Sequence, residues 1–315
     1  MKTLFFAYPG ELDTPTGGYG YDWQIIAGLR GLGWQVELVP LGDGFPFPTG
    51  EARAQAQEAL ERLPDGARLI VDGLAFGVLP EAAAAVSGRL DLHALVHHPL
   101  CRETGVSEAQ AANLLQCERQ ALTHARHIIV TSQATATQVA DLFGVEADRI
   151  TVVLPGTEKQ ECAVRQEADR LRLLAVGTVV RRKGYDLLFA ALGDLRDIDW
   201  DLDIVGGLDA DPDCHSELQE QLSAFGLTDR VTFNGADTPE NLTANTRKAD
   251  TLPEGAAIYC GTEDTKRLRN ALKLLMTDER KRLDMAAHAR VAAQNLPDWK
   301  DAAAMFAAAL NGVNR

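Results

Sequence analysis

The sequence lacks the features of several protein classes. Its 315 residues include few cysteines, and none of them forms a Cys-x-x-Cys pair: Cys101, Cys117, Cys162, Cys214 and Cys260. We therefore expect reduced thiols and a cytoplasmic protein rather than a disulfide framework or a zinc site. No apolar run reaches the roughly 18 residues of a membrane-spanning helix, so no transmembrane segment is predicted.

Positive charge is also scarce. Lysine and arginine total 31 against 45 aspartate and glutamate residues, which gives a formal net charge of −14. Nucleic-acid binding needs clustered positive charge to displace counterions, so this composition argues against a nucleic-acid partner. Aromatic residues make up only 6% of the chain while glycine occurs 27 times, a balance that favours an α/β fold with many tight turns.

Short apolar runs alternate with helical patterns twice along the chain. The first series runs from a strand at 3–7 to a strand at 150–153, and the second begins with a strand at 171–176. Alternation of this kind predicts parallel sheets covered by helices. We therefore predict two Rossmann-like parallel-sheet domains joined by a polar linker near residues 155–168, with an N-terminal domain at 1–156 and a C-terminal domain at 157–295.

A glycine-rich loop is predicted directly after the first strand, at Thr16-Gly17-Gly18-Tyr19-Gly20. Ligands bind at the carboxyl ends of strands in open α/β sheets, and glycine lets backbone amides approach a phosphate or a sugar. The alternative is a turn that needs a positive φ. The spacing is not G-x-G-x-x-G and the second strand does not end in an acidic residue, so a nicotinamide enzyme is disfavoured.

Three cations follow the first strand of the second half, at Arg181-Arg182-Lys183. Such a cluster is costly without a counter-anion, and a diphosphate is a natural partner, because arginine binds two oxygens at once and lysine adds a point charge. A solvated charge run is the alternative, but the position at the end of a strand favours an anion site.

Two histidines, His97 and His98, stand before Pro99 at the end of the fourth strand. A lone histidine is more often structural, whereas a pair at the carboxyl end of a strand raises the case for a functional role. Both histidines are therefore candidate catalytic residues.

The chain resembles glycosyltransferase family four, the retaining GT-B enzymes, in several segments. These are the Gly17-Gly18 stretch, the His97-His98 strand end, VVLPGT (152–157), LLAVGTVVRRKGYDLLFAAL (173–192) and LPDWKDAAAMFAAAL (296–310). The resemblance implies two Rossmann-like domains facing a cleft, with residues 296–315 as a closing helix that packs on the first domain.

The resemblance also implies an activity and roles for residues. It implies transfer of a sugar, with retention, from a UDP- or GDP-sugar to an acceptor that is a glycan, a lipid or a small molecule. Arg182 and Lys183 would hold the diphosphate with Gly17 and Gly18 close by, while His97, or less favourably His98, would lie beside the transferring sugar. No metal and no further cofactor are implied.

One part of the family pattern is missing. Family members carry a glutamate, seven residues and a second glutamate that holds the ribose, and no such pair follows residue 236 here. A strand–helix–strand block of about 35–40 residues is expected to be absent near 244–250. This absence favours a second interpretation, a non-catalytic relative that binds a nucleotide or a partner without transfer. A nucleotide-sugar epimerase of the same architecture is a third interpretation, which the 152–157 segment and the closing helix disfavour.

Overall fold

The computed structural model describes residues 2–13, 17–103, 105–157, 170–236, 255–261 and 264–312. The chain forms two compact units. Unit 1 consists of Met1–Glu158 with Leu296–Arg315, and unit 2 consists of Lys159–Asn295. No helix in the described ranges combines the length and apolarity that crossing a membrane requires.

Unit 1 is built on a six-stranded parallel sheet with the strand order β2-β1-β3-β4-β5-β6. The strands are β1 (Thr3–Tyr8), β2 (Gln35–Pro40), β3 (Arg68–Asp72), β4 (Asp91–Val96), β5 (His127–Val130) and β6 (Ile150–Val152). Strands β3, β4 and β5 are nearly continuous apolar runs, because helices cover both faces of this sheet.

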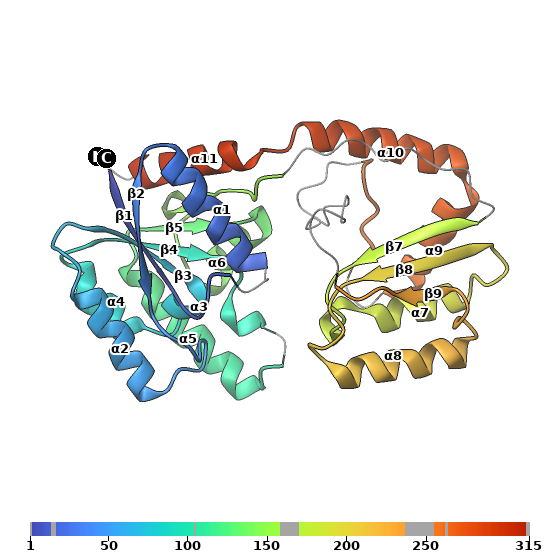
Figure 1. Cartoon of the computed structure of the whole chain (residues 1–315), viewed down its shortest axis with the longest axis horizontal. Coiled ribbons are helices and arrows are strands. Elements are labelled where there is room, and N and C mark those ends of the chain that lie inside the picture. Colours follow the sequence, from blue (N-terminus) through green and yellow to red (C-terminus); the bar gives the residue numbers. More distant parts are fainter. Residues whose placement is uncertain are drawn as a thin grey trace. The chain divides into compact units, whose positions relative to one another are not determined.

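The helices of unit 1 divide between these two faces (Figure 1). Helices α1 (Gly17–Gly31) and α11 (Trp299–Gly312) pack together on one face. The other face is covered by four helices, α2 (Gly50–Glu61), α4 (Pro80–Ser87), α5 (Glu108–His124) and α6 (Gln133–Phe143), together with the short α3 (Gly73–Phe76). Two 3-10 turns, η1 (Leu100–Arg102) and η2 (Ala147–Arg149), are the other helical elements described in this unit.

Two close backbone approaches seat α11 in unit 1. A Cβ on Gly28 of α1 would overlap the side chain of Ala303, and a Cβ on Gly156 would overlap Trp299. Phe306 of α11 is fully buried in the core between α1 and the sheet. The last helix of the chain is thus part of the core of the first unit.

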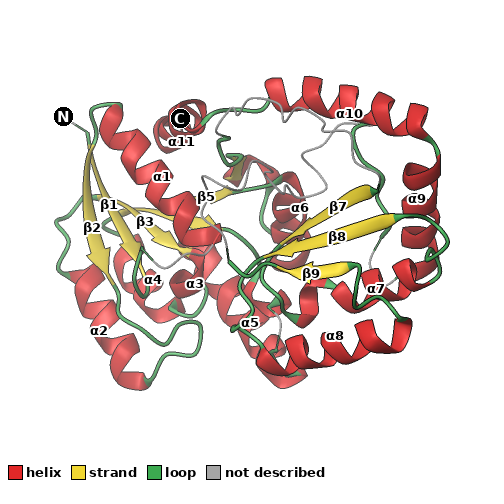
Figure 2. Ribbon diagram, turned by 45° about the vertical axis from the view of Figure 1, so that its right-hand side comes forward, coloured by secondary structure: helices red, strands yellow, loops and turns green. Residues whose placement is uncertain are grey.

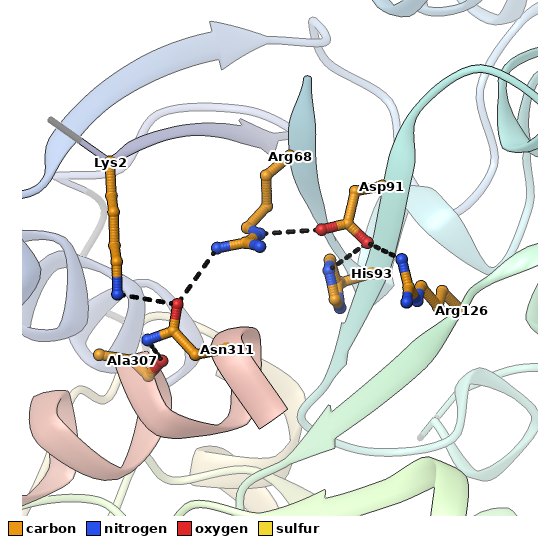
Figure 3. Close-up of polar contacts among 7 residues, drawn as sticks. All are labelled: Lys2, Arg68, Asp91, His93, Arg126, Ala307 and Asn311. Carbon is orange, nitrogen blue, oxygen red and sulfur yellow. Dashed lines mark hydrogen bonds and ion pairs between the residues drawn. The ribbon is translucent and has the colours of Figure 1, made fainter. Parts of the chain in front are cut away.

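Polar contacts extend this attachment to the amino ends of the strands (Figure 3). Asn311 of α11 accepts from Lys2 at 3.0 Å and from Arg68 at 3.5 Å. Arg68 also donates to Asp91 at 2.9 Å, and His93 Nε2 lies 3.2 Å from the same carboxylate. Burial alone would raise the pKa of Asp91, but His93 and Arg68 hold it well below its ordinary value.

Unit 2 contains a three-stranded parallel sheet in its described residues, ordered β7-β8-β9 (Figure 2). The strands are β7 (Leu171–Val176), β8 (Trp200–Val205) and β9 (Val231–Phe233), and the helices are α7 (Tyr185–Gly193), α8 (Pro212–Phe225), α9 (Thr265–Thr277) and α10 (Glu279–Gln294), with the 3-10 turn η3 (Arg181–Lys183). One core cluster joins α7, α8 and α9 to one face of the sheet.

The opposite face of the β7–β8 pair carries charged side chains. Arg172 of β7 donates to Asp203 of β8 at 3.0 Å, and Arg170, just before β7, donates to Asp201 at 3.0 Å. Leu174 lies on the same side of β7 and is 55% exposed. Among the described residues, the two faces of this sheet therefore differ, one apolar and buried, the other polar and at least partly exposed.

The sequence located these strands well but misjudged the glycine-rich stretch. Gly17, Gly18 and Gly20 belong to the first turns of α1 instead of a loop, and none of them has a positive φ. The apolar stripe that follows, which includes Ile25 and Leu29, is buried against the sheet and holds the helix despite its glycines. The block expected to be missing near 244–250, and most of the expected linker, lie outside the described residues.

Candidate functional site

Two strand ends and one helix bring three titratable side chains together in unit 1. Strand β3 ends at Asp72, which caps α3 by accepting a hydrogen bond from the Leu74 amide at 2.9 Å. Strand β4 pairs with β3 in parallel, so His97, directly after β4, emerges at the same edge of the sheet. Asp22 comes from the buried side of α1.

One ring nitrogen of His97 joins the cluster. His97 Nε2 lies 3.0 Å from Asp22 Oδ1 and 3.2 Å from Asp72 Oδ2. Both aspartates are buried, whereas 23% of the His97 side chain is exposed. The Tyr21 ring packs edge-to-face with the imidazole, and the two ring centroids lie 5.4 Å apart. A Cβ on Gly18 would lie 3.6 Å from His97 Cδ2. The ring is therefore packed against α1, and part of the side chain stays accessible.

The backbone of His97 is fixed as well. Its carbonyl accepts from the hydroxyls of Thr131 at 3.5 Å and Thr135 at 3.3 Å. Thr135 belongs to the first turn of α6, whose N-cap Ser132 accepts from the Thr135 amide. Elements on both sides of β4 thus hold this histidine in place.

Electrostatics favour a charged imidazole. Burial by itself lowers the pKa of His97, but the charges and hydrogen bonds of Asp22 and Asp72 outweigh it and raise the pKa to about 10. Burial raises the pKa of Asp22 to about 6, against the opposing effect of His97. Asp22 Oδ2 is buried without a hydrogen-bond partner in the described residues.

The donor atoms of this cluster also have the spacing of metal ligands. One atom from each of Asp22, Asp72 and His97 lies within 4.8 Å of the others. A metal would need the lone pair of a neutral imidazole, and two carboxylates at that nitrogen favour the protonated ring instead. The expectation of a site without a metal stays a prediction.

His98 points to a different partner. Its Nε2 lies 3.6 Å from Glu103 Oε1, so the structure does not bring His98 into the Asp22–Asp72–His97 cluster. The segment after it is fixed by Glu118 of α5, whose Oε2 accepts from the Leu100 amide at 2.9 Å. Burial raises the pKa of Glu118 to about 8.

The basic turn of unit 2 follows the carboxyl end of β7. Arg181 is paired with Glu217 of α8 through two hydrogen bonds of 2.6 and 2.7 Å. No ion pair of Arg182 or Lys183 occurs among the described residues. The Lys183 side chain lies over Gly177, where an added Cβ would be 3.2 Å from Lys183 Cε. Partial burial, and then the charge of Arg182, lowers the pKa of Lys183.

The structure thus separates the predicted site residues by their surroundings. It places Gly18 against His97 and puts Arg182 and Lys183 in one turn, while a Cβ on Gly17 would meet nothing within 4 Å. The sequence analysis missed Asp22 and Asp72. Asp72 was visible as a polar residue ending an apolar strand, and Asp22 as an acid in line with the apolar stripe of α1.

Known proteins match this chain in one stretch of its sequence and in its overall fold. Residues 157–252 match the family model described as Glycosyl transferases group 1. No curated protein sequence matches the chain. The apo form of the lipopolysaccharide outer core galactosyltransferase WaaB superposes with a TM-score of 0.70 at 16% identity, covering 99% of both chains. A glycosyltransferase from Rickettsia africae ESF-5 gives 0.68 at 12% identity, covering 99% of this chain and 98% of that one.

A third solved structure holds a nucleotide. Alr3699/HepE from Anabaena, in complex with UDP, superposes with a TM-score of 0.69 at 18% identity and covers 99% of this chain and 100% of its own. Another structure of the same protein contains UDP-glucose. The GT-B fold is thereby confirmed for the chain, and the resemblance to group 1 glycosyltransferases is confirmed over residues 157–252.

Proposed function

We propose that this chain transfers a sugar from a UDP- or GDP-sugar to an acceptor, with retention of the anomeric configuration. The family match over residues 157–252 and a fold shared with transferases over their full length support this class of reaction. The HepE complexes with UDP and UDP-glucose support a nucleotide-sugar donor.

The observation that carries the proposal is the basic turn after β7. Arg181 already has an anion in Glu217, whereas no ion pair of Arg182 or Lys183 occurs in the described part of the chain. A diphosphate supplies the missing negative charge at the place where α/β sheets bind ligands. The arginine would bind two of its oxygens and the lysine would add a compact charge.

The proposed chemistry asks the protein mainly for position and charge. The leaving diphosphate takes up the proton of the acceptor hydroxyl, and Arg182 and Lys183 stabilise the charge that develops on it. Gly17 and Gly18 let the donor approach the first turn of α1. His97 lies at the transferring sugar, and His98 is the less favoured candidate because it is paired with Glu103.

Replacing Lys183 by alanine tests the diphosphate site. Calorimetry with UDP and with GDP should show binding weaker by about 1.5–3 kcal/mol, the contribution of a hydrogen bond to a charged group. Arg181→Ala is the matched control from the same turn, because the Arg181 guanidinium is occupied by Glu217. Unchanged affinity in Lys183→Ala would remove the turn from the donor site.

A non-catalytic nucleotide-binding protein is the second candidate, favoured by the missing Glu-x7-Glu pair after residue 236. The two candidates differ in turnover. Incubation with UDP-glucose or GDP-mannose should release free nucleotide if the chain is a transferase, since water replaces a missing acceptor slowly in such sites. Tight binding of UDP with no nucleotide released from either donor, with or without added acceptors, would favour the second candidate.

A further inference from the structure

The contacts of His97 determine which protonation state of its ring fits between Asp22 and Asp72. Asp22 Oδ1 and Asp72 Oδ2 both approach the same nitrogen, Nε2, at 3.0 and 3.2 Å. That nitrogen must carry a proton, because a lone pair facing two carboxylate oxygens would be repelled. The remaining variable is the other nitrogen, Nδ1.

We infer that His97 is a permanent imidazolium whose Nε2–H is shared by Asp22 and Asp72 and whose Nδ1–H donates a hydrogen bond to a neutral oxygen of the bound substrate, such as a sugar hydroxyl. In this state His97 holds its proton throughout the reaction and does not act as a general base. The identity of the substrate oxygen rests on the proposed function, whereas the charge state of the ring does not.

The need for a cation follows from the burial of two acids. Asp22 is fully buried and Asp72 is 2% exposed, and two carboxylates in such a place are costly without an opposite charge. His97 is the cation that acts on Asp22, and the other charge acting there is Asp72 itself. A neutral His97 would leave two buried negative charges uncompensated.

The other groups around the cluster offer no substitute cation in the described residues. From α1, Tyr21 faces the ring, and the pKa of Tyr19 is raised by burial and then by the charges of Asp72 and Asp22. From β5 and α6, only the hydroxyls of Thr131 and Thr135 reach the His97 carbonyl. After β4, His98 is paired with Glu103. The charge balance of the cluster therefore depends on His97, in agreement with its pKa of about 10.

The His97 side chain keeps enough exposure for a ligand to reach it, and Nδ1 is the ring nitrogen that the aspartates leave open. No hydrogen bond of His97 Nδ1 occurs within the part of the chain that the structure describes, and 23% of the side chain is open to solvent. With two ionised aspartates and one imidazolium, the cluster keeps one net negative charge. A neutral hydroxyl fits such a donor better than a phosphate does, since the phosphate would be repelled by the excess charge.

Nuclear magnetic resonance of protein labelled with ¹⁵N in its histidine rings tests the charge state directly. The His97 signals, assigned by their loss in His97→Gln, should keep both nitrogens protonated through neutral pH and titrate near 10. An ordinary midpoint of about 6.5, or a neutral ring at neutral pH, would overturn the inference. If His97→Gln does not fold, through-bond assignment of the wild-type spectrum identifies the same signals, so the titration still decides this point.

Two variants test whether the aspartates are what raises the pKa of His97. Asp22→Asn and Asp72→Asn should each lower the midpoint of His97, because each removes one carboxylate from Nε2, and His98→Gln should leave it unchanged. Paramagnetic Mn²⁺ should not broaden the His97 signals beyond those of other histidines. Selective broadening there would overturn the inference by placing a metal at Nε2.

Kinetics separate a positioning role for the aspartates from a purely structural one. Once a donor is turned over, the pH profile of kcat between about 7 and 9 should contain no ionisation that His97→Gln removes, because His97 keeps its proton in this range. Asp22→Asn should lower kcat on the order of tenfold with a smaller change in the donor KM. A basic limb near neutral pH that disappears in His97→Gln would identify a general base instead. Absence of any turnover would contradict the proposed function and leave the resonance result standing.

Discussion

The two units use the same parallel-sheet plan but bury their strands differently. In unit 1, strand β3 reads Arg-Leu-Ile-Val-Asp, and its last four residues are all buried. In unit 2, strand β8 reads Trp-Asp-Leu-Asp-Ile-Val, and its two aspartates lie on the open face. Continuous apolar runs accompany a sheet covered on both faces, whereas alternation accompanies a sheet covered on one.

The first strand of each unit shows the same difference in burial when two leucines are compared. Leu4 of β1 is completely buried in the core that the sheet shares with α1 and α11, and Leu174 of β7 is 55% exposed. Charged groups follow this division. Unit 1 buries Asp22, Asp72 and Glu118, while the pairs of unit 2, such as Arg172–Asp203, include an exposed partner. Within the described ranges, the buried carboxylates therefore lie in unit 1.

The largest effect should come from shortening the same side chain in both units. Leu4→Ala should lower the free energy of unfolding by about 2–5 kcal/mol, because it leaves a cavity in a core closed on both sides. Leu174→Ala should change it by no more than about 0.5 kcal/mol, the usual range for surface substitutions. Urea denaturation followed by circular dichroism measures both variants under the same conditions.

The predicted difference between the two sheets would be contradicted if both variants lost the same free energy of unfolding. Such a result would mean that Leu174 is covered in solution and that the open face of β7 has a partner. A loss confined to Leu4→Ala would instead confirm that the two sheets are covered to different extents.

The sequence predicted the strands of both units and only part of the site. His97 could be found because it ends an apolar strand, and the basic turn could be found because three cations stand together. Asp22 was missed because its neighbours in space, Asp72 and His97, are 50 and 75 residues away, and spacing within a helix does not reveal them. The same holds for Glu118, whose partner is a backbone amide in the turn after β4.

The second effect concerns pH, and it should arise in unit 1. The pKa of Glu118 is raised by burial from 4.5 to about 8, so the stability that its neutral form contributes is complete below 4.5 and is lost as the pH rises towards 8. Between pH 6 and 8 the wild type should therefore lose about 1 kcal/mol more per pH unit than Glu118→Gln, which cannot ionise. Urea denaturation at several pH values gives both slopes.

His97 contributes to the slope in the same direction, because its pKa is raised too, but it does so equally in wild type and variant. Glu108→Gln is the matched control, since Glu108 lies on the same helix and is exposed. A Glu118→Gln slope equal to that of the wild type would show that this carboxyl is ionised throughout the range and is not buried in solution.

The smallest effect concerns the helix that closes the second face of unit 1. Helix α11 packs on α1 so closely that a Cβ on Gly28 would overlap Ala303, whereas a Cβ on Gly20 of the same helix would meet nothing within 4 Å. Gly28→Ala should therefore cost about 1–2 kcal/mol by forcing the two helices apart, while Gly20→Ala should be neutral or stabilise by about 0.5–1 kcal/mol through helix propensity. The same denaturation measurement compares them, and each replaces glycine by alanine within α1. If Gly28→Ala proved as stable as Gly20→Ala, then α11 would not be seated closely on α1 in solution, and α1 would have to cover more of this face of the sheet by itself.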